Sequence, residues 1–122
     1  MNITKNYLAD GAIDQYLIVK MGSDEEHVTE AAAATDVSVG VTTIVGADAA
    51  EERVDVVHFG VAKVKAGGTI SAGGFVTADS AGKGVAASPA SGVNNYVIGR
   101  ALQDAVNGDI FNVLIMPTRI QG

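Results

Sequence analysis

The stretch VKAGGTISAGGFVTADSAGKGVAA, residues 64–87, is rich in glycine and contains no cysteine or histidine. Its paired glycines flank the short segment at 69–71, and the β-favouring residues of FVTA at 75–78 predict a strand. DSAGKG at 79–84 begins with Asp, which bonds to nearby backbone amides in turns, and its glycines can adopt positive φ. The glycines therefore stand where strands turn, and the stretch predicts β structure.

A glycine-rich loop can also bind a phosphate, so we compared this stretch with the known phosphate-binding motifs. A Walker A loop has the pattern G-x-x-x-x-G-K-S/T, in which backbone amides surround the phosphates while Lys and the hydroxyl reach the terminal phosphate and magnesium. Neither AGGTISAGG at 66–74 nor SAGKGV at 80–85 has that ending. A dinucleotide-binding loop would also need a helix after it, whereas a strand follows here. The sequence favours turns over a phosphate site.

Further short strands are predicted on both sides of this stretch. VSVGVTTIV at 37–45 is dense in β-branched residues, and RVDVVHF at 53–59 alternates before Gly60 breaks the pattern. HVTEAAAATD at 27–36 is ambiguous because its alanines favour a helix, but Val and Thr near its start favour a strand followed by a loop. Other strands are expected at 15–21, 61–65, 85–87, 96–102 and 110–116, the last ending before Pro117. Short strands at such spacing predict an all-β barrel or sandwich.

Composition limits the possible functions. The chain has 122 residues, which fits one domain, and its apolar residues are largely Ala and Val with three Phe, three Tyr and no Trp. So thin a core predicts oligomerisation. The net charge of −6 argues against nucleic-acid binding, which relies on clustered Lys and Arg. No apolar run approaches the roughly 20 residues of a membrane helix, and the start has no signal-peptide pattern, so a soluble chain with no membrane partner is expected.

The sequence assigns no catalytic, cofactor-binding or metal-binding residue. His27 and His58 lie in different predicted strands, and the chain has no cysteine to complete a zinc site. The serines lack the Gly-x-Ser-x-Gly pattern of a hydrolase elbow. Acidic residues at 24–26 are typical of a solvated turn. We therefore expect a protein that is not an enzyme, although an uncharacterised small β-barrel enzyme or binding module stays open as an alternative.

A second alternative concerns Lys20. The segment IVKMG at 18–22 faintly resembles the Lys-Met pair that biotin-carrier domains present at a hairpin, and those domains are also small β structures. The residues expected just before the lysine are absent, and Lys20 falls inside a strand-like run. A carrier domain modified on Lys20 is the alternative to the interpretation below.

Nearly the whole chain resembles the capsid cement, or head decoration, proteins of tailed bacteriophages, in the family designated DUF2190. The resemblance rests on an order of elements: VGVT at 39–42, then EERVDVVHFGVAKVKAGGTISAGGFVTADSAGKGVAA at 51–87, and NNYVIGRALQDAVNGDIFNVLIMP at 94–117. It implies a small, tulip-like β-barrel with an extended N-terminal arm, commonly assembled as a homotrimer on the outer surface of an icosahedral head.

The implied function is mechanical. Such a protein is made in the cytoplasm of the bacterial host and binds the major capsid protein on the virion surface, stabilising the shell by bridging neighbouring subunits. Residues 12–122 are expected to form the single β domain and residues 1–11 the arm, because the latter are polar and lack periodicity. Ile3, Tyr7 and Leu8 are the apolar side chains with which such an arm would contact the capsid or a neighbouring copy.

Overall fold

The computed structural model describes residues 2–122, which form nine β-strands and contain no helix, and hence none that could cross a membrane. The all-β prediction is confirmed. In chain order the strands are β1 (Ile3–Ala9), β2 (Ile18–Met21), β3 (His27–Glu30), β4 (Ser38–Thr42), β5 (Arg53–Lys65), β6 (Phe75–Ala78), β7 (Gly84–Ala86), β8 (Asn94–Ala101) and β9 (Ile110–Gln121).

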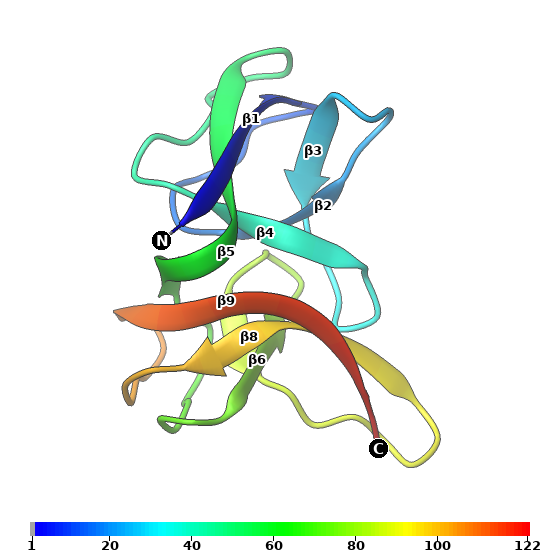
Figure 1. The fold of residues 1–122 in the computed structure, drawn as a ribbon, viewed down its shortest axis with the longest axis vertical. Helices are drawn as coiled ribbons and strands as arrows, with labels where there is room; N and C mark the ends of the chain where they lie inside the picture. Colours follow the sequence, from blue (N-terminus) through cyan, green and yellow to red (C-terminus); the bar gives the residue numbers. More distant parts are fainter. Residues whose placement is uncertain (1) are drawn as a thin grey trace.

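Five of the strands close into a barrel, which occupies the upper half of Figure 1. Their order is β1-β3-β2-β4-β5, and β1 pairs back onto β5 to complete the circle. The closing ladder is antiparallel and runs from Ile3 opposite Phe59 to Leu8 opposite Arg53. Closure gives each of these five strands a neighbour on both sides, and β1 joins β3 through Leu8 and Ala9.

The long strand β5 belongs to both halves of the molecule. Beyond the barrel it pairs with β9, and the sheet continues in the order β5-β9-β8-β6-β7. Figure 1 labels β9, β8 and β6 below the barrel. A single parallel bridge between Ala66 and Gly84 brings β7 back toward the end of β5. The upper barrel and the lower sheet therefore share one continuous strand.

Gly60 allows β5 to change direction between the two halves. Its φ is +118°, and a side chain there would collide with Asn2. The Asn2 side chain bonds both backbone groups of Val61, accepting from its N–H at 3.0 Å and donating to its carbonyl at 2.9 Å. The glycine that the sequence analysis expected to end a strand instead bends a continuous one.

The two halves have separate cores built mostly from small aliphatic side chains. Each contains one large aromatic residue, Tyr7 above and Phe111 below. On β5 the adjacent residues Val56 and Val57 are both buried, the first in the upper core and the second in the lower one. The strand therefore switches the face that it buries where it passes from barrel to sheet.

The structure corrects the prediction that residues 1–11 form an extended arm. Ile3–Ala9 form barrel strand β1, in which Tyr7 and Ala9 are buried, whereas Met1 lies outside the described residues. The segment shows no periodicity because most of its side chains point to solvent, and its strand conformation is fixed by backbone pairing with β5. Tertiary pairing here overrides a weak local pattern.

Two other boundaries are informative. The ambiguous segment 27–36 is a strand, His27–Glu30, followed by a loop, as the sequence analysis favoured. The last strand does not end before Pro117 but continues to Gln121. The register between β8 and β9 shifts between Val97 and Gly99, which marks a bulge opposite Pro117. A bulge accommodates proline because no ladder hydrogen bond from that residue is required.

Candidate functional site

The glycine-rich turn at 79–83 uses its own amides. The Asp79 carboxylate accepts from the backbone N–H groups of Ala81 at 2.8 Å and Lys83 at 3.0 Å, and the Gly82 N–H donates to the Asp79 carbonyl. Gly82 has a φ of +74°, which a turn of this kind requires. These three amides donate to Asp79, so the geometry is that of a β-turn, and they are not free to donate to a phosphate.

Lys20 lies within β2 and is engaged in an ion pair. Its Nζ is 3.0 Å from Oδ2 of Asp36, and the side chain is one-third exposed. The tip of the β2–β3 hairpin falls at residues 22–26, beyond Lys20. A carrier lysine must lie at a hairpin tip and have a free side chain. Lys20 lies within a strand, and its side chain is paired with Asp36.

The two histidines hold separate parts of the barrel together. His27 lies between carboxylates, with Nδ1 2.6 Å from Asp24 and Nε2 2.9 Å from Glu51. Hydrogen bonds to Asp24 and then to Glu51 raise the pKa of His27 to about 9, so the ring is protonated at neutral pH. His58 bonds the Tyr7 hydroxyl at 2.7 Å and the Val39 carbonyl at 2.6 Å. Within residues 2–122 no cluster of His, Asp and Glu is arranged to hold a metal ion.

A group of exposed and half-buried apolar side chains lies on the outer face of the strands around β5. Strand register places Val61 opposite Leu114, Leu114 opposite Arg100, and Arg100 opposite Phe75. Directly opposed residues in antiparallel strands project to the same face. Four strands therefore contribute one continuous row of side chains.

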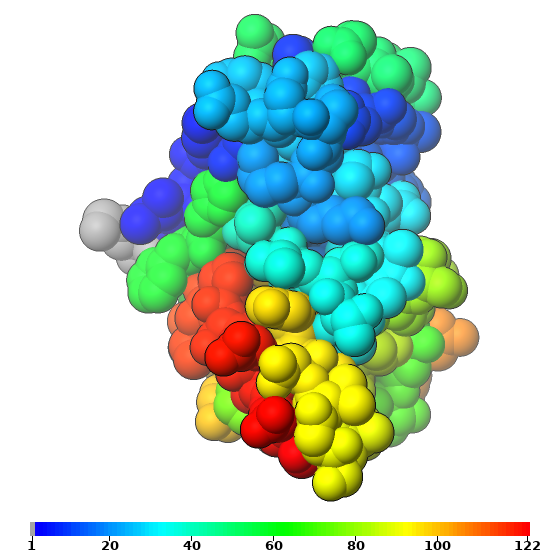
Figure 2. Space-filling model, turned by 90° about the vertical axis from the view of Figure 1, so that its right-hand side faces the viewer, coloured from blue at the N-terminus to red at the C-terminus, as the bar shows by residue number. Residues whose placement is uncertain are grey.

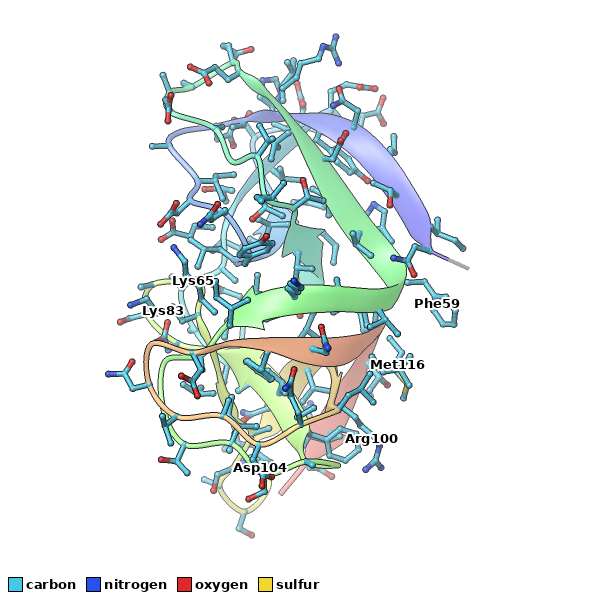
Figure 3. All side chains as sticks on the ribbon, turned by 90° about the vertical axis from the view of Figure 1, so that its left-hand side faces the viewer. Phe59, Lys65, Lys83, Arg100, Asp104 and Met116 are labelled. Carbon is cyan, nitrogen blue, oxygen red and sulfur yellow. The ribbon has the colours of Figure 1, made fainter. Side chains whose placement is uncertain are left out.

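The row is extended at the β1–β5 junction. Ile3 lies opposite Phe59, and these two side chains and Val61 are each about half exposed, at 52%, 50% and 48%. Figure 3 shows Phe59, Met116 and Arg100 along one side of the molecule. We call this surface the apolar strip, and its members are Ile3, Phe59, Val61, Phe75, Arg100, Leu114 and Met116.

The charge on the apolar strip is basic, although the whole chain is acidic. Arg100 stacks over the Phe75 ring at 4.1 Å and donates to the Gly73 carbonyl at 2.8 Å, which fixes its side chain on the surface. Lys63 follows two residues after Val61 on the same exposed face of β5. Apolar side chains flanked by arginine and lacking carboxylates are the composition of protein–protein contact surfaces.

The three residues proposed from the sequence have different positions. Ile3 lies at one end of the apolar strip, Leu8 is half-buried, and Tyr7 is only 6% exposed inside the barrel core. Tyr7 therefore stabilises the fold and is not available to a partner. The sequence analysis missed Phe59, Val61 and Leu114, whose only signal was alternation within β-strands.

The structure is that of an all-β protein with a closed five-stranded barrel, an appended sheet and the apolar strip on its surface. Its fold is similar to that of the N base of head fiber gp8.5 of bacteriophage phi29, with a TM-score of 0.72. The alignment covers 100% of both chains at 18% sequence identity, a level that establishes the fold alone. No family model and no curated protein matches the chain, so membership of DUF2190 is not confirmed.

Proposed function

We propose that this protein is a structural component of a bacteriophage head, attached to the outer surface of the shell as a decoration or cement protein. The observation that carries the proposal is the apolar strip, which exposes Phe59 and Val61 on a rigid sheet face. The resemblance of the sequence to cement proteins and the similarity of the fold to a phage head fiber base both support it.

In this proposal the protein acts by binding and performs no catalysis. Its partners are the major capsid protein and, in a homotrimer, two further copies of itself. A specific contact needs about 1,000 Å² or more of buried surface, and a strip spanning five strands is a suitable centre for one. Many copies bridging neighbouring capsid subunits add binding free energy that is present only in the assembled shell.

Specific contacts in the structure argue against the two alternatives, a carrier domain and an enzyme. A carrier role would need Lys20 to be free, but it is paired with Asp36. An enzyme would need converging catalytic groups, whereas both histidines are held in hydrogen bonds within the barrel.

The test uses heads of the encoding phage assembled without this protein. Purified protein is added, the heads are sedimented, and bound copies are counted as a function of concentration. We expect saturable binding, with loaded heads retaining their DNA at temperatures that empty bare heads. Folded protein that stays in the supernatant at every concentration would refute head attachment, and saturable binding without added heat resistance would refute the cement role.

A further inference from the structure

Two exposed apolar features lie at opposite ends of strand β4, which crosses the middle of the molecule in Figure 1. Beyond its last residue, Ile44 and Val45 are each 68% exposed, more than any other large apolar side chain in residues 2–122. We call these two residues the loop pair. Directly before the strand, Val37 is 56% exposed. An extended chain advances about 3.3 Å per residue, so the strand keeps the two features well apart.

The loop pair is held rigidly in solvent. On one side of it, the backbones of Ala47 and Ile13 exchange two hydrogen bonds, at 2.8 and 2.9 Å. On the other side, the Thr43 carbonyl accepts from the Tyr16 N–H at 3.3 Å. A loop fixed at both ends loses little conformational freedom on binding, so the loop pair is preorganised for an apolar contact.

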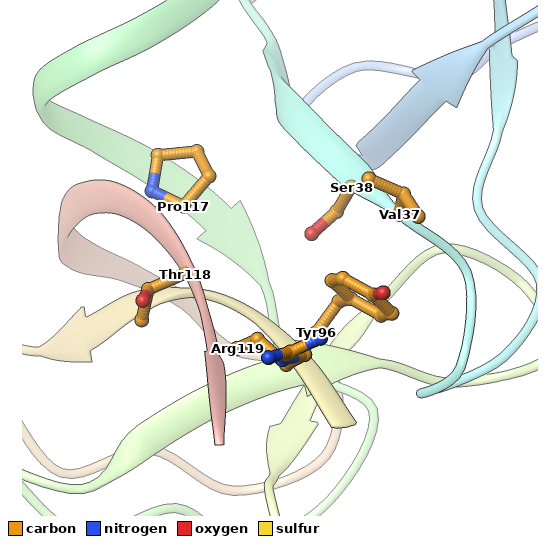
Figure 4. A pocket seen from close by; sticks show the side chains of 6 residues that line it. All are labelled: Val37, Ser38, Tyr96, Pro117, Thr118 and Arg119. Carbon is orange, nitrogen blue, oxygen red and sulfur yellow. The ribbon is translucent and has the colours of Figure 1, made fainter. Parts of the chain in front are cut away.

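A hollow lies at the other end of β4, where the upper barrel meets the lower sheet. It has a volume of about 320 Å³ and is lined by Val37, Ser38, Tyr96, Pro117, Thr118 and Arg119 (Figure 4). Figure 2 shows the β4 region (cyan) lying directly above β8 (yellow) and the end of β9 (red). Val37, Pro117 and the Tyr96 ring give the hollow an apolar wall that can receive aliphatic side chains.

The two features carry opposite charge. Loop 43–52, which contains the loop pair, has three acidic residues and no Lys or Arg. Strands β8 and β9, which form most of the hollow, have two arginines, one of them Arg119, and no Asp or Glu. The same asymmetry holds for the molecule, because residues 2–57 contain eleven acidic and three basic residues whereas 58–122 contain three and five. Two acidic loops repel each other, but an acidic loop is attracted to the hollow.

We infer that the loop pair of one copy of this chain inserts into the hollow of a second copy. The contact buries apolar side chains of both copies and brings the acidic loop of one toward Arg119 of the other. Because each copy carries both features on different sides, the contact is head-to-tail, and repetition of such a contact can close a ring. The inference deepens the homotrimer of the proposed function, on which the number of copies rests, and leaves the apolar strip free for the head.

Sedimentation of the free protein between about 1 and 100 μM tests this contact. We expect the parent to form trimers. Ile44→Asp and Val37→Asp should each weaken self-association at least about tenfold, because each places a charge in an apolar contact. Val106→Asp is the matched control, since Val106 is 56% exposed like Val37 but lies on the β8–β9 turn, and it should associate as the parent does. Circular dichroism verifies that all variants fold.

Mixing the two defective variants tests the head-to-tail geometry. Ile44→Asp keeps an intact hollow and Val37→Asp keeps an intact loop pair, so one contact can form between them and no ring can close. We expect an equimolar mixture to form a heterodimer and no larger species. A mixture that stays monomeric or forms trimers would overturn the inference, as would a monomeric or dimeric parent, or either variant associating as the parent does.

A charge reversal tests the electrostatic part. Arg119→Glu should weaken self-association about tenfold, whereas Arg100→Glu, on the apolar strip, should leave it unchanged. Equal effects of the two reversals would exclude the hollow as the contact and overturn the inference. All these measurements use free protein, so their failure is distinguishable from a failure of head attachment.

Discussion

Replacing Tyr7 tests whether the N-terminal segment is a structural strand or a dispensable arm. The side chain is 6% exposed in the barrel core, and its hydroxyl bonds Nε2 of His58 at 2.7 Å. Tyr7→Ala removes the only large aromatic side chain of the upper core, and truncation of a buried aromatic costs about 3–5 kcal/mol. Because native domains are stable by only about 5–15 kcal/mol, this loss would be a large fraction of the free energy of unfolding.

Equilibrium urea unfolding followed by far-UV circular dichroism measures the change. Tyr7→Phe keeps the ring and removes only the hydroxyl, so it should cost about 1–2 kcal/mol by leaving Nε2 of His58 without its partner, while Nδ1 keeps its bond to the Val39 carbonyl. Thr4→Val, on the exposed side of the same strand, is the control and should stay within about 0.5 kcal/mol of the parent. A loss below about 1 kcal/mol for Tyr7→Ala would show that the strand is not part of the stable fold.

Three other substitutions test local features. Gly82→Val should cost about 2 kcal/mol or more in urea unfolding, because φ is +74° and Glu30 lies close by, whereas Gly11→Ala should be nearly neutral; equal losses would contradict this. The His27 ion pairs should stabilise the fold fully below its ordinary pKa of 6.5 and lose that contribution as pH rises through about 9, so unfolding free energy should fall across this window in the parent but less in His27→Gln. A parent curve with the same slope as the variant would refute the assignment. Lys83→Ala should cost under about 1 kcal/mol, and calorimetry should detect no ATP binding to the parent; ATP binding lost in this variant would establish a phosphate loop.

The strands that the sequence predicted best are those with their own apolar pattern. RVDVVHF and IFNVLIM carry β-branched alternation that reports burial on one face, and both are strands. β1 has no such pattern because only Tyr7 and Ala9 face the core. Gly60 and Pro117 are local breakers, but a bend and a bulge absorb them within continuous strands. Such accommodation depends on neighbouring strands and is invisible in local sequence.

The apolar strip was unpredictable for a related reason. Alternation within one strand shows which side chains share a face, as for Phe59 and Val61, but it does not show which strands become neighbours. Phe75, Arg100 and Leu114 meet only because β6, β8 and β9 pair in that order. The hollow beside β4 likewise emerges only when β4 is placed against the lower sheet.

The most direct test of the account is whether the apolar strip attaches the protein to heads. Binding isotherms on heads assembled without this protein are measured for the parent, for Phe59→Asp, and for Val93→Asp, a control that charges an exposed apolar residue directly before β8 and outside the apolar strip. Circular dichroism first verifies that all three proteins fold. The account predicts at least about tenfold weaker binding for Phe59→Asp, the cost of losing an aromatic anchor, and an unchanged isotherm for Val93→Asp. Parent-like binding of Phe59→Asp, or an equal loss in both variants, would contradict it.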